Sequence, residues 1–146
     1  MQHVLYKVNK AIAYNYFKAY EAGDIEAVMK FLAPNYILHP GGDGKSMNLD
    51  ERKLDEIVFF SAFSSIKTVV EDQIAEGDKI ANRVIMHCTH TANYQGIAAT
   101  ENRVVIPYID ILRIEAGKIV EEWVEFDVAN IIKQINVRSV KHESPV

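Results

Sequence analysis

The stretch from Arg103 to Asp127, RVVIPYIDILRIEAGKIVEEWVEFD, limits the possible folds more than any other part of the chain. Two runs rich in Val, Ile, Tyr and Trp flank the segment Glu115-Ala116-Gly117-Lys118, which is the pattern of a β-hairpin. The expected turn is a three-residue loop, Glu115 to Gly117, because Gly117 reaches the left-handed conformation at little cost. We therefore expect a long antiparallel strand pair late in the chain.

The predicted turn determines which side chains face each other across this hairpin. Side chains opposed in an antiparallel pair share one side of the sheet, so one face is predicted to carry two carboxylates among apolar groups. A loop one residue longer would instead place Asp110 opposite Trp123. The predicted pairs are Ile114 with Lys118, Leu112 with Val120, Asp110 with Glu122, Tyr108 with Val124 and Ile106 with Phe126.

The rest of the sequence predicts helices first and strands later. Gly23 should end the first helix, and Asp24, Asn48 or Asp50, and Asp127 are placed to cap the later ones. The predicted helices cover about 4–22, 25–32, 50–63 and 128–135, and further strands cover 36–39, 67–76 and 79–91. The predicted buried sides are Leu5, Val8, Ile12, Tyr16 and Ala19 on the first helix, and Leu54, Ile57, Val58 and Phe60 on the third.

This order of elements is typical of an α+β domain in which helices pack on one face of an antiparallel sheet. A strongly curved sheet of this kind, closed on one side by the N-terminal helices, forms a cone-shaped cavity suited to a small molecule. At 146 residues the chain is expected to form a single domain over 1–136, followed by a loose tail over 137–146.

Composition narrows the classes of partner. The net charge of −4 argues against nucleic acid or an anionic membrane as a partner, since either would need a basic face. The single cysteine, Cys88, excludes an internal disulfide and makes a reducing cytoplasm the default location. No run approaches 18 apolar residues, and the N-terminus lacks the pattern of a signal peptide.

The segment His87-Cys88-Thr89-His90 is not expected to hold a metal. On a strand, His87 and His90 point to opposite faces, and Cys88 with His90 supplies only two ligands. His90 shares its face with Val84 and Met86, so we interpret it as a residue that lines the pocket and contacts the substrate.

Asp110 is the strongest candidate for chemistry. Between Ile109 and Ile111, on the face that also holds Tyr108, its carboxyl would be poorly hydrated, and repulsion from Glu122 would raise its pKa further. A neutral carboxylic acid can donate a hydrogen bond to a developing enolate. The alternative is that Asp110 pairs with a structural cation, and that Glu122 is a solvated strand residue rather than a second acid/base group.

Three segments resemble a known family. They are YFKAYEAGDIEAV at 16–28, CTHT at 88–91 with Gly96-Ile97, and IDILR at 109–113 with GKIVEEW at 117–123. Together they resemble the SnoaL-like polyketide cyclase branch of the nuclear-transport-factor-like, cystatin-like cone fold, over roughly residues 8 to 136. This cone hosts cyclases, isomerases, dehydratases, hydrolases and silent binders.

Ketosteroid isomerase, a more distant relative, is similar around Gly23-Asp24-Ile25-Glu26-Ala27. The resemblance implies that Tyr16 holds an oxyanion, that His39 replaces an aspartate as the catalytic base, and that Asp110 is the protonated acid. Tyr16 has the alternative of being plain core, and His39 that of a satisfied loop-edge histidine. The cyclase branch often reads His-Trp-Asp on its last strand, where this chain has Glu122-Trp123-Val124.

The sequence therefore predicts a SnoaL-like enzyme of the polyketide or ester cyclase type that needs no cofactor. It would act on a small hydrophobic carbonyl compound through an enolate, by intramolecular aldol cyclisation or isomerisation. The alternative is a non-catalytic binder of a small hydrophobic ligand. Trp123, predicted on the outer face of the sheet, suits an interface of a homodimer or homotetramer. The candidate residues are, as catalytic groups, Tyr16, His39, Asp110 and Glu122, and, as substrate contacts, Met86, His90, Tyr108, Val124 and Phe126.

Overall fold

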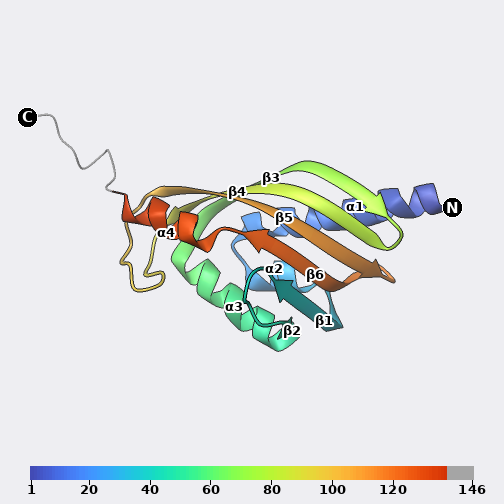
Figure 1. Cartoon of the computed structure of the whole chain (residues 1–146), viewed down its shortest axis with the longest axis horizontal. Helices are drawn as coiled ribbons and strands as arrows, with labels where there is room; N and C mark the ends of the chain where they lie inside the picture. Colours follow the sequence, from blue (N-terminus) through green and yellow to red (C-terminus); the bar gives the residue numbers. More distant parts are fainter. Residues whose placement is uncertain (138–146) are drawn as a thin grey trace, which may run out of the picture.

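The predicted order of early helices and late strands is confirmed by the structure, a computed structural model that describes residues 1–137 (Figure 1). The tail predicted over 137–146 lies, apart from Val137, outside the described residues. The elements are α1 (Gln2–Ala19), the 3₁₀ turn η1 (Tyr20–Ala22), α2 (Ile25–Met29), β1 (Leu32–Pro40), β2 (Met47–Asn48), α3 (Leu49–Ala62), β3 (Phe63–Glu76), β4 (Lys79–His90), β5 (Arg103–Glu115), β6 (Lys118–Phe126) and α4 (Val128–Asn136).

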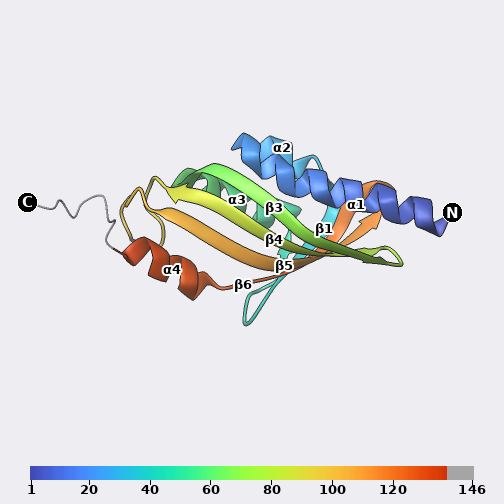
Figure 2. The same cartoon turned by 90° about the horizontal axis from the view of Figure 1, so that it is seen from above.

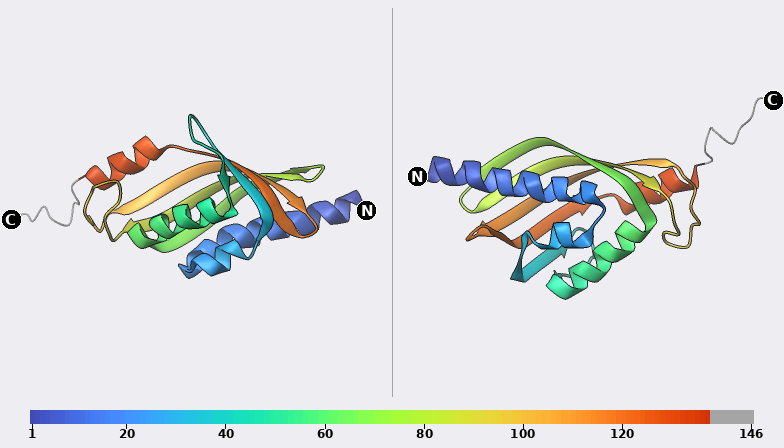
Figure 3. Two further views of the ribbon diagram at one scale, coloured as in Figure 1. Left: turned by 90° about the horizontal axis from the view of Figure 1, so that it is seen from below. Right: turned by 180° about the vertical axis from the view of Figure 1, so that it is seen from behind.

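The strands form one curved six-stranded sheet in the order β2-β1-β6-β5-β4-β3. Four of its strand pairs are antiparallel, as predicted, but β1 and β6 are parallel. The parallel pair arises because β1 enters the sheet from α2 rather than through a hairpin with β6. The sheet is not closed into a barrel, and helices α1, α2 and α3 lie on one of its faces (Figures 2 and 3).

The central hairpin is present, but its predicted register is wrong by two residues. The turn contains two residues, Ala116 and Gly117, both with positive φ (49° and 79°), which suits the twist of a hairpin. An irregularity between Arg113 and Ile114 then adds one more residue to the β6 side. A shift by an even number preserves the face of every side chain. The observed pairs are Leu112 with Glu122, Asp110 with Val124 and Tyr108 with Phe126.

Side-chain caps begin three of the helices. Asp24 accepts a hydrogen bond from Glu26 N, and Asp127 accepts one from Asn130 N, each at 3.0 Å, as the sequence predicts. Asn48, rather than Asp50, caps α3, in a reciprocal capping box with Glu51. These caps fix where α3 starts and therefore which of its side chains face the sheet.

The predicted buried side of α3 is wrong except at Phe60, which is partly buried against the core. Leu54, Ile57 and Val58 are 66%, 44% and 58% exposed, whereas Glu56 and Ala62 are buried. The helix directs Arg52 and Glu56 inward because they contact each other and further buried polar groups there, as described below. On α1 the predicted buried side is correct at Tyr16, which is fully buried, but wrong at Leu5 and Val8, which are each 50% exposed, while the neighbouring Asn9 is buried.

Candidate active site

A cavity of about 660 Å³ lies between the inner face of the sheet and the helices α1 and α3. Most of its wall is apolar, and the sheet contributes Leu38, Met86, Ile106, Tyr108, Val124 and Phe126. Its polar groups come from two sides: Asp110 and Glu122 from strands β5 and β6, and Tyr20, Arg52 and Glu56 from the helical side. This combination of an apolar wall and a few converging polar groups is typical of a small-molecule site.

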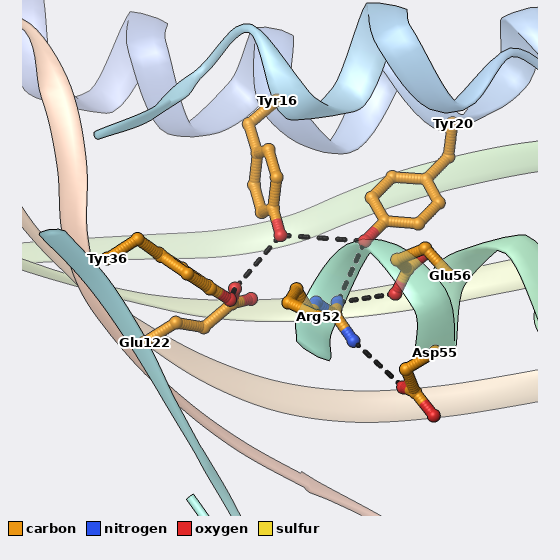
Figure 4. A network of polar contacts seen from close by, with 7 residues as sticks. All are labelled: Tyr16, Tyr20, Tyr36, Arg52, Asp55, Glu56 and Glu122. Atoms are coloured by element: carbon orange, nitrogen blue, oxygen red, sulfur yellow. Dashed lines mark hydrogen bonds and ion pairs between the residues drawn. The ribbon is translucent and has the colours of Figure 1, made fainter. Parts of the chain in front are cut away.

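Glu122 accepts hydrogen bonds from two tyrosines. Tyr16 donates to its Oε1 at 2.9 Å and Tyr36 donates to the same oxygen at 2.6 Å (Figure 4). Burial, and secondly the charge of Glu122, raises the pKa of both tyrosines well above the ordinary range, so both hydroxyls stay protonated and donate. Both bonds end on Oε1, and the other oxygen of Glu122 receives neither.

Asp110 lies beside Glu122 and is fully buried. Among the described residues, no donor group reaches either oxygen of its carboxyl. Burial raises the pKa of Asp110 well above its ordinary value, and the charge of Glu122 raises it further. The shift favours the protonated form of Asp110, whose carboxyl has no hydrogen-bond partner among the described residues and can donate to a molecule in the cavity.

Arg52 on α3 forms the second polar cluster of the cavity. Its Nη2 contacts Glu56 Oε1 at 2.6 Å and donates to Tyr20 Oη at 3.0 Å, while its Nη1 lies 3.4 Å from Asp55 Oδ2. The neighbouring charge of Glu56 raises the pKa of Arg52 despite the opposing effect of burial, so the guanidinium remains charged. This buried ion pair explains why α3 turns its polar side inward.

A continuous series of contacts joins the two clusters (Figure 4). Tyr20 Oη lies 3.5 Å from Tyr16 Oη. Because the hydroxyl hydrogen of Tyr16 is directed to Glu122, Tyr20 is the donor in this longer contact. The series therefore runs from Arg52 through Tyr20 and Tyr16 to Glu122, and each group donates to the next.

The structure brings together three of the four predicted catalytic residues, Tyr16, Asp110 and Glu122. It does not bring His39 to them. In the parallel pair His39 aligns with Trp123, and the inward-facing Leu38 aligns with Glu122, so the imidazole lies on the outer face of the sheet. There it contacts Glu121 Oε2 at 2.7 Å and Ser46 Oγ at 3.0 Å, and it stacks on Trp123 with 5.3 Å between ring centroids.

Of the predicted substrate contacts, Met86, Tyr108, Val124 and Phe126 line the cavity, whereas His90 does not. His90 is fully buried beside the cavity wall, with its ring tilted against Phe63. Thr100 N donates to its Nδ1 at 3.3 Å and Thr100 Oγ1 lies 2.9 Å from the same atom. The alternation along β4 places His90 on the inner face as predicted, but the loop after β4 covers it.

The sequence analysis did not identify four residues of the site: Tyr20, Tyr36, Arg52 and Glu56. The alternation of Tyr36-Ile37-Leu38-His39 along a strand was a usable signal, because it separates Tyr36 from His39. The spacing of Arg52 and Glu56 indicates a helical pair, but nothing in the sequence says that this pair is buried.

Residues 1–137 contain neither a cluster of metal ligands nor a membrane-spanning helix. No group of three or more His, Cys, Asp and Glu side chains is arranged to hold a metal there. No helix in that range has the length and apolar character needed to cross a membrane. Cys88 belongs to the hydrophobic core, and burial raises the pKa of its thiol to about 12, so the thiol stays protonated.

Comparison with known proteins identifies the family. A family model described as SnoaL-like polyketide cyclase matches residues 10–135. The chain belongs to this family. No curated protein sequence matches the chain.

Solved structures of SnoaL-like and related proteins share the fold. AclR from Streptomyces galilaeus, assigned as a hydroxylase, is 21% identical with a TM-score of 0.79, over 87% of this chain and 94% of AclR. IdmH from Streptomyces antibioticus, assigned as a polyketide cyclase, is 21% identical with a TM-score of 0.75, over 88% of this chain and 99% of IdmH. A protein of ketosteroid isomerase-like fold from Catenulispora acidiphila is 11% identical with a TM-score of 0.71, over 86% of this chain and 92% of that one.

Proposed function

We propose that this SnoaL-like protein is an enzyme that forms an enolate from a small, largely apolar carbonyl compound without a cofactor. The observation that supports this most directly is the Asp110–Glu122 pair, two buried carboxyl groups in the wall of an apolar cavity, where burial raises the pKa of Asp110. Such a pair offers both a proton donor and a proton acceptor at the same pH.

In the proposed reaction Glu122 removes a proton from the carbon beside the carbonyl. The C–H bond breaks, its electron pair forms the enolate, and Asp110 donates a hydrogen bond to the enolate oxygen. Tyr16 and Tyr36 hold Glu122 in place through its Oε1. The enolate then takes a proton at another carbon, which is isomerisation, or attacks a second carbonyl of the same molecule, which is aldol ring closure. Glu122 thus takes the role that the sequence assigned to His39.

Exchange of the α-hydrogens of a ketone with D₂O reports enolate formation without knowledge of the natural substrate. We expect the protein to accelerate this exchange for 2-heptanone, followed by proton NMR, and Glu122→Gln to lower the rate by roughly 10²–10⁴-fold. Gln keeps the size of Glu122 and an acceptor for the tyrosines, so it removes mainly the base. Exchange by Glu122→Gln within a few-fold of wild type would exclude Glu122 as the base.

A non-catalytic binder is the second candidate, and Val124 is the residue that favours it. Val124 pairs with Asp110 across the hairpin and lines the cavity, at a position where the cyclase branch often carries an acid. A binder would retain 2-heptanone, seen as broadening of its NMR signals, while its α-hydrogens exchange no faster than in buffer.

The outer face of the sheet supports a proposal about assembly. Ile109, Ile111 and Trp123 form an apolar strip there: Ile111 pairs with Trp123, and Ile109, two residues along β5, is 47% exposed. Lys79 Nζ lies 5.6 Å from the ring centroid of Trp123. An apolar face of this kind suits an interface between copies of the chain, so a homodimer or homotetramer is proposed. Cytoplasmic location is proposed from the single, protonated cysteine.

A further inference from the structure

Buried polar atoms without a hydrogen-bond partner gather in the wall of the cavity. In the described part of the chain they are Asp110 Oδ1 and Oδ2, Arg52 Nε, Glu56 Oε2 and His90 Nε2, and all except that of His90 belong to residues that line the cavity. The Asp110 oxygens already have a role in the proposed function, in which this carboxyl donates a hydrogen bond to the enolate oxygen. Arg52 Nε has no such explanation, because a guanidinium keeps its protons in a protein and its N–H groups can only donate.

Arg52 is also placed to meet a ligand. Its side chain is 11% exposed and lines the cavity, whereas Glu122 and Asp110 are 2% and 0% exposed. Three contacts, of 3.0, 3.5 and 2.9 Å, lead from Arg52 Nη2 through Tyr20 and Tyr16 to Glu122 Oε1. The guanidinium and the acid pair are therefore separated by no more than three hydrogen-bond lengths, within reach of one small molecule.

Glu56 and Asp55 orient the guanidinium without using all of its donors. Glu56 contacts Nη2, Asp55 contacts Nη1, and Tyr20 also accepts from Nη2, so the Nε–H remains without a partner among the described residues. Arg52 carries the positive charge of a network that otherwise consists of tyrosines and carboxyls (Figure 4). An oxygen that gains negative charge beside Arg52 during a reaction would therefore be stabilised by this cation.

We propose that Arg52 is a catalytic residue that binds the second carbonyl oxygen of a dicarbonyl substrate through its free Nε–H, which makes the site ring-closing rather than isomerising. The proposal rests on the proposed function, because it uses the enolate that Glu122 and Asp110 form. Isomerisation needs one carbonyl and leaves Arg52 without a partner, whereas aldol closure needs a second carbonyl to be polarised at a fixed distance.

The ring-closing step balances without any added reagent. The enolate carbon forms a bond to the second carbonyl carbon, and the π bond of that carbonyl breaks toward its oxygen. This oxygen becomes an alkoxide held by Arg52, and it then takes the proton that Glu122 removed in the first step. The product is a cyclic β-hydroxy ketone with the same composition as the substrate, and Glu122 returns to its starting state.

The symmetrical diketone 2,6-heptanedione is a suitable probe, because its closure gives 3-hydroxy-3-methylcyclohexanone. The monoketone 2-heptanone is its control, since it can exchange α-hydrogens but cannot close. We expect wild-type protein to carry out both reactions, followed by NMR. The quantity to compare between variants is the ratio of ring closure to exchange, since this ratio cancels a general loss of folded protein.

The test variant is Arg52→Met with Glu56→Gln, because removal of both partners avoids an unpaired buried charge. We expect this double variant to lower the ratio by roughly 10²-fold or more. The matched control is Arg83→Met with Asp72→Asn, which removes an exposed ion pair outside the cavity and should keep the ratio near that of wild type. Far-UV circular dichroism and the exchange of 2-heptanone show that the variants are folded.

The outcomes separate the two proposals. Exchange of 2-heptanone without closure of the diketone by wild-type protein would overturn the role of Arg52 and leave the proposed function in place. An unchanged ratio in the double variant would overturn it as well. If wild-type protein accelerates neither reaction, the proposed function fails first, and the role of Arg52 fails with it.

Discussion

Tyr16 and Glu122 are separated by 106 residues, and their hydrogen bond of 2.9 Å ties the first helix to the last strand of the sheet. The bond lies in the cavity wall, where Tyr36 donates to the same carboxylate oxygen from β1. Three elements from different parts of the chain thus fix one carboxylate. This arrangement couples the packing of α1 to the position of the proposed base.

The first prediction concerns Tyr16→Phe. The ring remains, but Glu122 loses one of its two donors, so we expect a loss of about 1–3 kcal/mol in the free energy of unfolding and a fall in 2-heptanone exchange of roughly 10-fold. Urea unfolding and NMR exchange measure the two effects. Tyr14→Phe is the matched control on the same helix, since Tyr14 is 44% exposed and should change neither quantity. Equal effects of the two variants would contradict the role of Tyr16.

The hairpin, the order of elements and the caps at Asp24 and Asp127 could be predicted because they depend on local patterns. Strand alternation also sufficed to place Asp110 and Glu122 on one face. The register could not be fixed, because the irregularity beside Arg113 adds a residue without any mark in the sequence. An even shift left the two carboxyls together, whereas an odd one would have separated them.

Which face of an element a side chain occupies was harder to predict where the resemblance to a known family guided the interpretation. His39 was assigned to the cavity from its place before Pro40, although alternation with Tyr36 and Leu38 points it outward. Arg52 was missed because apolar periodicity predicts the buried side of a helix, and α3 buries a polar pair instead. Part of the support for that pair comes from Tyr20 on another helical segment, and a local sequence pattern does not report such a contact.

The second prediction concerns pH and Asp110. Its pKa is raised in the folded protein above the unfolded value near 3.8. The stabilising contribution of the protonated carboxyl is therefore fully present below the unfolded pKa and decreases as pH rises toward the folded pKa. Asp110→Asn mimics the neutral acid, so its free energy of unfolding relative to wild type should improve as pH rises above about 4. Urea unfolding at a series of pH values measures this, and a difference that is independent of pH would show that the pKa is not raised.

The third prediction separates the sequence interpretation from the structure at His39. His39→Gln should leave 2-heptanone exchange within a few-fold of wild type, because the imidazole lies on the outer face against Trp123. The comparison is Glu122→Gln, measured under the same conditions by NMR. A loss at His39→Gln as large as that of Glu122→Gln would return the role of base to the histidine.

The fourth prediction concerns assembly through the outer face of the sheet. Ile109→Glu places a charge on the exposed apolar strip beside Trp123, so burial of that strip against a second copy would become unfavourable. We expect sedimentation velocity to show an oligomer for wild type and a smaller species for Ile109→Glu. Leu5→Glu is the matched control, since Leu5 is 50% exposed on α1, a helix that covers the other face of the sheet (Figure 2). Dissociation by Leu5→Glu but not by Ile109→Glu would move the interface to α1, and a monomeric wild type would exclude both.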